Sequence, residues 1–165
     1  MDAIKTITGA PIDQGTLLHT STTIVLDRML LDHLPAGVVV HDAQSAIVAA
    51  NLAAQRLLGR SVDQLLGKVA TDPVWRFVHP DKTTMAVDEF PAARVLRDRQ
   101  PISDLVLGVE QAAAIRWLIC NAYPVFDAHG ALHSAVVCFT DCTELKTAEQ
   151  ALQRSEQRLQ LVLRG

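Results

Sequence analysis

Cysteines and histidines near the carboxyl end are the residues of this 165-residue chain best suited to metal or redox chemistry. Three residues separate Cys138 from Cys142, and three separate His129 from His133. Neither pair has the paired spacing of a zinc site, and both straddle the boundaries of the expected elements. Cys120 makes the number of cysteines odd, without the spacing of a disulfide framework. We therefore predict structural roles, no metal site, and a reducing, cytoplasmic location.

Catalytic motifs are missing from the sequence. It has no glycine-rich phosphate-binding loop, no H-E-x-x-H and no G-x-S-x-G. We predict that this stretch of chain has no enzymatic activity of its own, although a longer parent protein could carry a kinase or a cyclic-dinucleotide enzyme.

The composition describes one globular domain with short extensions. Hydrophobic residues make up 49% of the chain and the net charge is -3, so the basic footprint of a nucleic-acid-binding protein is absent. No apolar run approaches the roughly 18 residues of a membrane span. We expect no nucleic-acid partner and no membrane contact by this stretch.

Periodicity divides the chain into four parts. Residues 1–20 have no period and predict a flexible leader, whereas 21–34 predict an amphipathic helix that ends before Pro35. Residues 35–141 form the expected core, and 142–165 form a carboxy-terminal helix or linker. Within the core we expect a hairpin at 37–49, short helices at 51–59 and 61–67, an irregular stretch at 68–88, a helix at 90–99, and strands at 103–109, 114–125 and 131–140.

The last helix has apolar residues at alternating steps of three and four, the seam of a coiled coil that needs a partner helix. We therefore expect a homodimer. Ser155 occupies one core position of this seam and weakens it. The other seam residues are Leu145, Ala148, Leu152, Leu159 and Val162.

Three local motifs resemble the PAS family of sensor domains. They are L-P-A-G-V-V-V-H-D at 34–42, N-L-A-A-Q-R-L-L-G at 51–59 and D-C-T-E-L-K at 141–146, with Cys142 in place of the usual isoleucine. The resemblance extends over about Leu31 to Leu163. It implies an α+β fold: a five-stranded antiparallel sheet with short helices on one face, flanked by an amino-terminal helix and a carboxy-terminal coiled-coil helix.

The resemblance also implies a ligand pocket between the inner face of the sheet and the short helices. His41 would be its obvious polar group; side chains that merely fill a core are the alternative. Cys120 would point inward and Cys138 outward, which predicts no disulfide between them. The expected pocket residues are Val39, His41, Trp75, Phe77, Phe90, Leu118, Cys120, Ala122, Val137 and Phe139.

No particular cofactor follows from the resemblance. Haem-binding members carry a histidine on or near the long helix, but residues 88–99 contain none, and His79 is the only nearby histidine. We expect His79 to be a solvated loop residue. The N-C-R-F-L-Q-like motif of flavin-binding members is also missing. Haem and flavin are both disfavoured, and the cofactor is left unknown.

The junction before the last helix is the expected relay. Asp141 is placed to cap this helix, and Glu144 three residues later could complete a capping box; Thr143 lies between them. The resemblance implies a sensory and dimerisation module of a bacterial signalling protein. It would relay a small-molecule or partner signal to a downstream histidine kinase or cyclic-dinucleotide enzyme in the same chain. The alternative is a ligand-free dimerisation spacer.

Overall fold

A computed structural model describes residues 28–165 of the chain. The leader predicted at 1–20, and the first part of the helix predicted at 21–34, lie outside the described residues. Residues 28–33 are helical, in agreement with the remaining part of that prediction.

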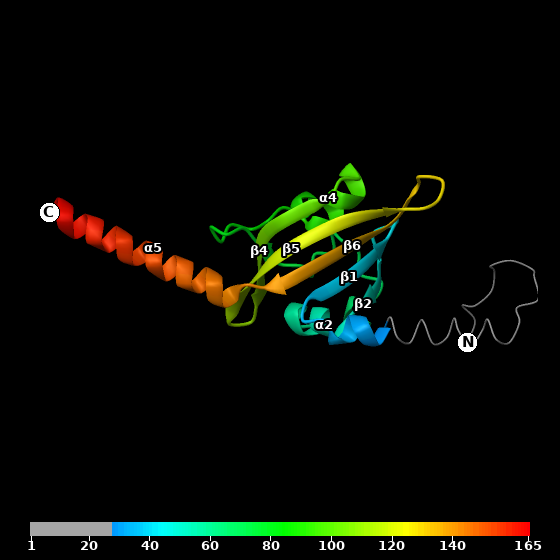
Figure 1. The fold of residues 1–165 in the computed structure, drawn as a ribbon, viewed down its shortest axis with the longest axis horizontal. Coiled ribbons are helices and arrows are strands. Elements are labelled where there is room, and N and C mark those ends of the chain that lie inside the picture. The colour runs from blue at the N-terminus through cyan, green and yellow to red at the C-terminus, as the bar shows by residue number, and fades with distance from the viewer. Residues whose placement is uncertain (1–27) are drawn as a thin grey trace, which may run out of the picture.

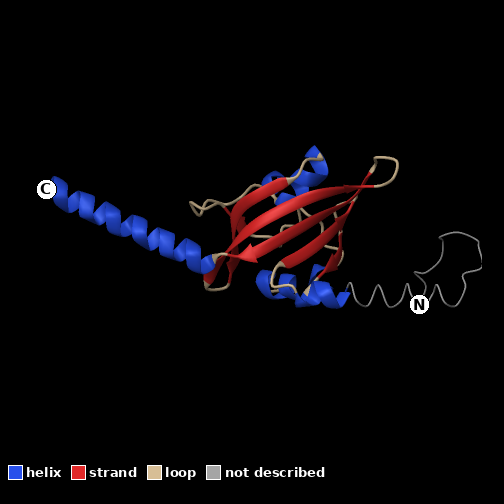
Figure 2. Ribbon diagram, in the orientation of Figure 1, coloured by secondary structure: helices blue, strands red, loops and turns tan. Residues whose placement is uncertain are grey.

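One antiparallel sheet of six strands forms the centre of the molecule, with the strand order β2-β1-β6-β5-β4-β3 (Figures 1 and 2). The first and last long strands are therefore neighbours. The bounds are Gly37–Asp42 for β1, Ile47–Ala50 for β2, Phe77–Val78 for β3, Ile102–Gln111 for β4, Ala114–Phe126 for β5 and Leu132–Asp141 for β6.

The predicted number of five strands was wrong by one. The additional strand, β3, contains only Phe77 and Val78, which pair with Val109 and Gly108 of β4. Two residues are too few to show the alternation by which a strand is recognised in a sequence. The predicted α+β fold, with an antiparallel sheet, several short helices and a carboxy-terminal helix, is confirmed.

Short helices cover the inner face of the sheet, and local capping explains where they begin and end. Asn51 accepts a hydrogen bond from the Ala54 N–H at the start of α2, Leu52–Leu58, which ends at Gly59 with a φ of 66°. Ser61 and Gln64 form a capping box at α3, Val62–Leu65. A 3₁₀ turn, η1, at Val87–Glu89 leads into α4, Pro91–Asp98, which has proline in its first turn.

The Asn51 side chain joins three parts of the fold. Its amide nitrogen donates to the carbonyl oxygens of Leu31 at 2.8 Å and Ala36 at 2.9 Å. Its oxygen accepts from the N–H groups of Val38 and Ala54, both at 2.9 Å. All these bonds are made by a side chain that is 4% exposed, so Asn51 fixes the chain between the first helix, β1 and α2.

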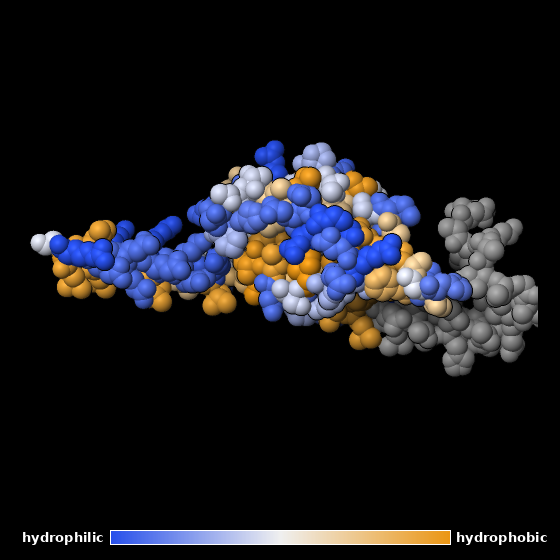
Figure 3. All heavy atoms as spheres, turned by 90° about the horizontal axis from the view of Figure 1, so that it is seen from above, coloured by the Kyte–Doolittle hydropathy of each residue, from blue (hydrophilic) through white to orange (hydrophobic). Residues whose placement is uncertain are grey.

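Helix α5, Thr143–Arg164, projects away from the sheet (Figure 1) and buries none of its residues. Figure 3 shows hydrophobic residues along one side of this helix and hydrophilic residues along the other. The seam residues Leu152 and Leu159 are 61% and 60% exposed. Between residues 28 and 165, no helix combines the length and hydrophobicity needed to cross a bilayer.

Candidate functional site

A cavity of about 60 Å³ lies between the inner face of the sheet and the helical side of the domain. Nine of the ten predicted pocket residues line it; the exception, Ala122, is fully buried on β5 but does not reach the cavity. The sequence analysis did not find six further lining residues: Ile47, Leu58, Ala70, Pro91, Ala92 and Leu107.

Most of these six residues lie in elements that are too short or too irregular for the sequence to show which side chains face the core. Ile47 begins a four-residue strand, and Ala70 lies in a turn. Pro91 and Ala92 occupy the first turn of α4, and the helical pattern there indicates a buried side without indicating what it faces. The prediction was most complete for β1, β5 and β6, where the resemblance implied which side chains face inward.

Aromatic side chains form one wall of the cavity. The rings of Phe77 and Phe90 meet edge to face, with centroids 4.8 Å apart, and Trp75 stacks on Phe77 at 6.1 Å. The Trp75 Nε1–H donates to the Val69 carbonyl oxygen at 3.0 Å, and the Arg60 guanidinium lies 5.7 Å from the Trp75 ring. These contacts fix the orientation of the wall.

His41 is the polar side chain on the opposite, sheet side of the cavity, and it is 5% exposed. Its Nδ1 lies 2.8 Å from the Ser45 carbonyl oxygen. Since a carbonyl oxygen can only accept, Nδ1 carries the proton. Burial lowers the pKa of His41, with smaller opposing effects from the Ser45 hydrogen bond and Asp42. The ring is therefore neutral near neutral pH, and its Nε2 holds a lone pair.

The cysteines are not arranged for redox or metal chemistry. Cys120, Cys138 and Cys142 are all free thiols. Burial raises the pKa of Cys120, which lines the cavity, to about 12, so the thiol is neutral and a poor nucleophile. Among residues 28–165, no three His, Cys, Asp or Glu side chains gather in a group that could hold a metal ion.

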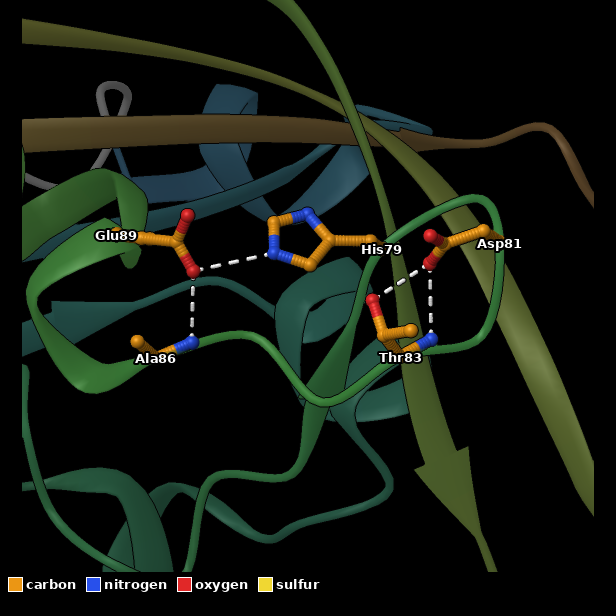
Figure 4. Close-up of polar contacts among 5 residues, drawn as sticks. All are labelled: His79, Asp81, Thr83, Ala86 and Glu89. Atoms are coloured by element: carbon orange, nitrogen blue, oxygen red, sulfur yellow. Dashed lines mark hydrogen bonds and ion pairs between the residues drawn. The ribbon is translucent and has the colours of Figure 1, made fainter.

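A polar clasp beside the aromatic wall joins the end of β3 to the start of α4 (Figure 4). The Glu89 carboxylate accepts from the Ala86 N–H at 2.8 Å and lies 3.1 Å from the His79 Nε2. These two hydrogen bonds, the first being the larger effect, lower the pKa of Glu89. Phe77 and Phe90 stand two residues before His79 and one after Glu89, so the clasp ties together the segments that carry the wall.

The predicted environment of His79 was therefore wrong: its side chain is 33% exposed and bonded to Glu89 rather than simply solvated. The turn that follows is held separately. Figure 4 shows the Asp81 carboxylate between the backbone N–H and the hydroxyl of Thr83, at 2.9 and 2.6 Å.

The junction between sheet and α5 is held by backbone bonds to β5. The Cys142 N–H donates to the Trp117 carbonyl oxygen at 2.8 Å, and the Trp117 N–H donates to the Thr143 hydroxyl at 3.0 Å. Asp141 accepts from the Thr143 N–H at 2.8 Å and lies 3.8 Å from Arg116. Strand β6 therefore continues into α5 through a fixed turn.

The predicted capping box at this junction was wrong. The N-cap residue of α5 is Cys142 rather than Asp141, and no side-chain cap bond is made there. Asp141 instead closes a turn onto the residue two positions ahead of it.

Comparisons with known proteins agree on the fold. A sequence model described as PAS fold matches residues 31–147. No curated protein sequence matches the chain. The chain resembles the PAS domain of BvgS from Bordetella pertussis, with 21% identity and a TM-score of 0.55, over 84% of this chain and 98% of that one.

Two other solved domains give the same result. The PAS domain of nitrogen regulation protein NR(II) from Vibrio parahaemolyticus is 15% identical with a TM-score of 0.52, over 70% of this chain and 97% of that one. The PAS domain of an HTR-like protein from Haloarcula marismortui is 12% identical with a TM-score of 0.58, over 78% and 99%. At these identities the likeness concerns the fold alone.

Proposed function

The chain belongs to the PAS family, and from this premise we propose that it is the sensory module of a signal-transduction protein. Its inner cavity would bind a small molecule, and α5 would carry the response to a downstream output domain. A ligand can shift such a module only through different affinities for two arrangements of the helix.

The observation that carries this proposal is the short path from cavity to helix. Phe139 of β6 lines the cavity, and Asp141 ends the same strand. The next residues, Cys142 and Thr143, are bonded to Trp117 on the neighbouring strand. A displacement of β6 by a ligand would therefore reach the first turn of α5 through bonded groups rather than through a flexible loop.

Pairing of two chains would complete the relay. The exposed apolar side of α5 supports a homodimer in which the seam residues of two helices meet. The output domain would be a histidine kinase or a cyclic-dinucleotide enzyme, as the resemblance to the family implies. Sedimentation velocity at increasing concentration tests the dimer: a species of twice the chain mass is expected, and a monomer throughout would contradict it.

A ligand-free spacer is the second candidate. The cavity is small, and an apolar core with a packing gap of about 60 Å³ requires no ligand to fold. In this case the domain would hold two chains together without responding to a small molecule.

Native mass spectrometry distinguishes the two candidates. The mass of the folded protein purified from its host is compared with its denatured mass, and an excess that disappears on unfolding is the expected result. Ala92→Val, which narrows the cavity, is the matched variant and is expected to lose the excess. Wild-type protein with no excess mass, and no binding of added small molecules, would support the spacer.

A further inference from the structure

We propose that the cavity selects a small, neutral, mostly apolar ligand carrying one hydroxyl group, whose hydrogen bond the Nε2 atom of His41 accepts. This inference rests on the proposed sensory function and specifies the chemistry of its ligand.

The tautomer of His41 determines which groups it can recognise. The Ser45 carbonyl oxygen, 2.8 Å away, requires the proton on Nδ1. The His41 ring makes its one bond within residues 28–165 through Nδ1, and no fully enclosed side-chain nitrogen or oxygen there lacks a partner. The unbonded Nε2 is therefore accessible to a water-sized group, and His41 lines the cavity. In the neutral ring this nitrogen can only accept, so its partner must be a donor. The bond to Ser45 also prevents the ring from turning over to offer its other nitrogen.

The rest of the cavity wall excludes charge. None of the lining side chains carries a full charge, and the lining is otherwise aliphatic or aromatic except for the neutral thiol of Cys120. The one other side-chain N–H group among the lining residues, Trp75 Nε1–H, already donates to the Val69 carbonyl oxygen. A carboxylate or ammonium group would lose its hydration here without gaining a counter-ion. A hydroxyl loses far less and finds its acceptor at His41.

The volume limits the size of the ligand. A water occupies about 30 Å³ in the liquid, and an engineered apolar cavity of about 150 Å³ binds benzene, which has six heavy atoms. On this scale a cavity of about 60 Å³ holds about two or three heavy atoms. A two-carbon alcohol such as ethanol therefore fits the space.

Three probes of equal size and shape test the inference on the full chain. Ethanol, propane and the ethylammonium ion each have three heavy atoms and differ only in the group attached to the ethyl chain. Their dissociation constants are measured by NMR titration of the ¹⁵N-labelled protein. We expect ethanol to bind more tightly than propane, and the ammonium ion not to bind.

The His41→Asn variant assigns the selectivity to one atom. The asparagine amide can donate to Ser45 from the position of Nδ1, but it removes the acceptor at Nε2. A buried hydroxyl without an acceptor is strongly disfavoured, so the affinity ratio of ethanol to propane should fall about tenfold. His129→Asn, which changes an exposed histidine in the turn between β5 and β6, is the matched control and should leave the ratio unchanged.

A measurement on the wild-type protein keeps the test independent of the variant's folding. The ¹⁵N shifts of the His41 ring should show a protonated Nδ1 and an unprotonated Nε2, and of the three probes only ethanol should move the Nε2 signal. An unprotonated Nδ1 would overturn the inference.

The outcomes separate this inference from the proposed function. Equal affinities for ethanol and propane, or tight binding of the ammonium ion, would overturn the hydroxyl selectivity while leaving a ligand-binding sensor in place. Failure of all three probes to bind would overturn both and favour the spacer.

Discussion

Filling the cavity should stabilise the domain and abolish ligand binding together. Ala92 lies in the first turn of α4, is 5% exposed and lines the cavity. Ala92→Val places two more methyl groups at this wall. In a packed core such an addition destabilises by about 1–3 kcal/mol, but beside an empty apolar space it buries new surface without displacing neighbours.

The magnitude follows from two opposing effects. Burial of two methyl groups stabilises by about 1.6 kcal/mol at about 0.8 kcal/mol each. Valine costs about 0.6 kcal/mol relative to alanine in a helix. The net gain is about 1 kcal/mol in the free energy of unfolding, or about 3 °C in Tm for a chain of this size.

Urea unfolding and thermal melting measure the stability, and NMR titration with ethanol measures the binding. Ala93→Val, at the half-buried neighbouring position that does not line the cavity, controls for the helix propensity of valine. We expect Ala92→Val to melt higher than wild type and to lose the binding of ethanol. A loss of more than 1 kcal/mol in this variant would refute the reasoning, since it would mean that the space is not available to side chains.

Three further predictions concern the clasp, the close packing of the sheet and the junction. In Gly37→Ala the new methyl group would lie 2.7 Å from the Phe139 Cζ, so the ring must move. The free energy of unfolding, measured in urea, should fall by about 1–3 kcal/mol. An unchanged free energy of unfolding would contradict this contact. Thr143→Val removes the hydroxyl that accepts the hydrogen bond of the Trp117 N–H. The Trp117 amide should therefore exchange faster, and the free energy of unfolding should fall by about 1 kcal/mol. Unaltered exchange would show that the bond is not formed. The pKa of Glu89 is lowered from 4.5, so its contacts stabilise the fold above that pH and are lost as pH falls through the lower folded value. Asp81 and Asp98 also have lowered pKa values and contribute a loss in the same direction. Urea unfolding against pH should therefore show a larger acid-side loss in wild type than in Glu89→Gln, and equal losses would argue against the clasp.

Much of the fold could be predicted because its signals are local. The predicted helices at 51–59 and 61–67 are confirmed, and Asn51, Gly59 and Ser61 mark their ends by their own side-chain or backbone chemistry. The resemblance to the family indicated which residues of β1, β5 and β6 would face inward. Such signals require only a few neighbouring residues.

The missing parts depend on contacts between distant residues. Strand β3 exists only because β4 is long enough to pair with Phe77 and Val78. His79 and Glu89 are ten residues apart, and the sequence between them has no helix or strand period from which their hydrogen bond could be predicted. Cys142 replaces Asp141 as N-cap of α5 because α5 starts one residue later than expected, where the Cys142 N–H is bonded to β5. No pattern within a single element reports such contacts.

Coupling between the cavity and α5 is measured most directly by amide hydrogen exchange at the junction. The Cys142 N–H is bonded to Trp117 at the point where β6 becomes α5, so its exchange reports on the start of the helix. Saturation of the cavity with ethanol should slow this exchange in wild type but not in Ala92→Val, in which the cavity is filled. Identical exchange at Cys142 with the cavity empty and saturated would contradict a sensory role for the domain.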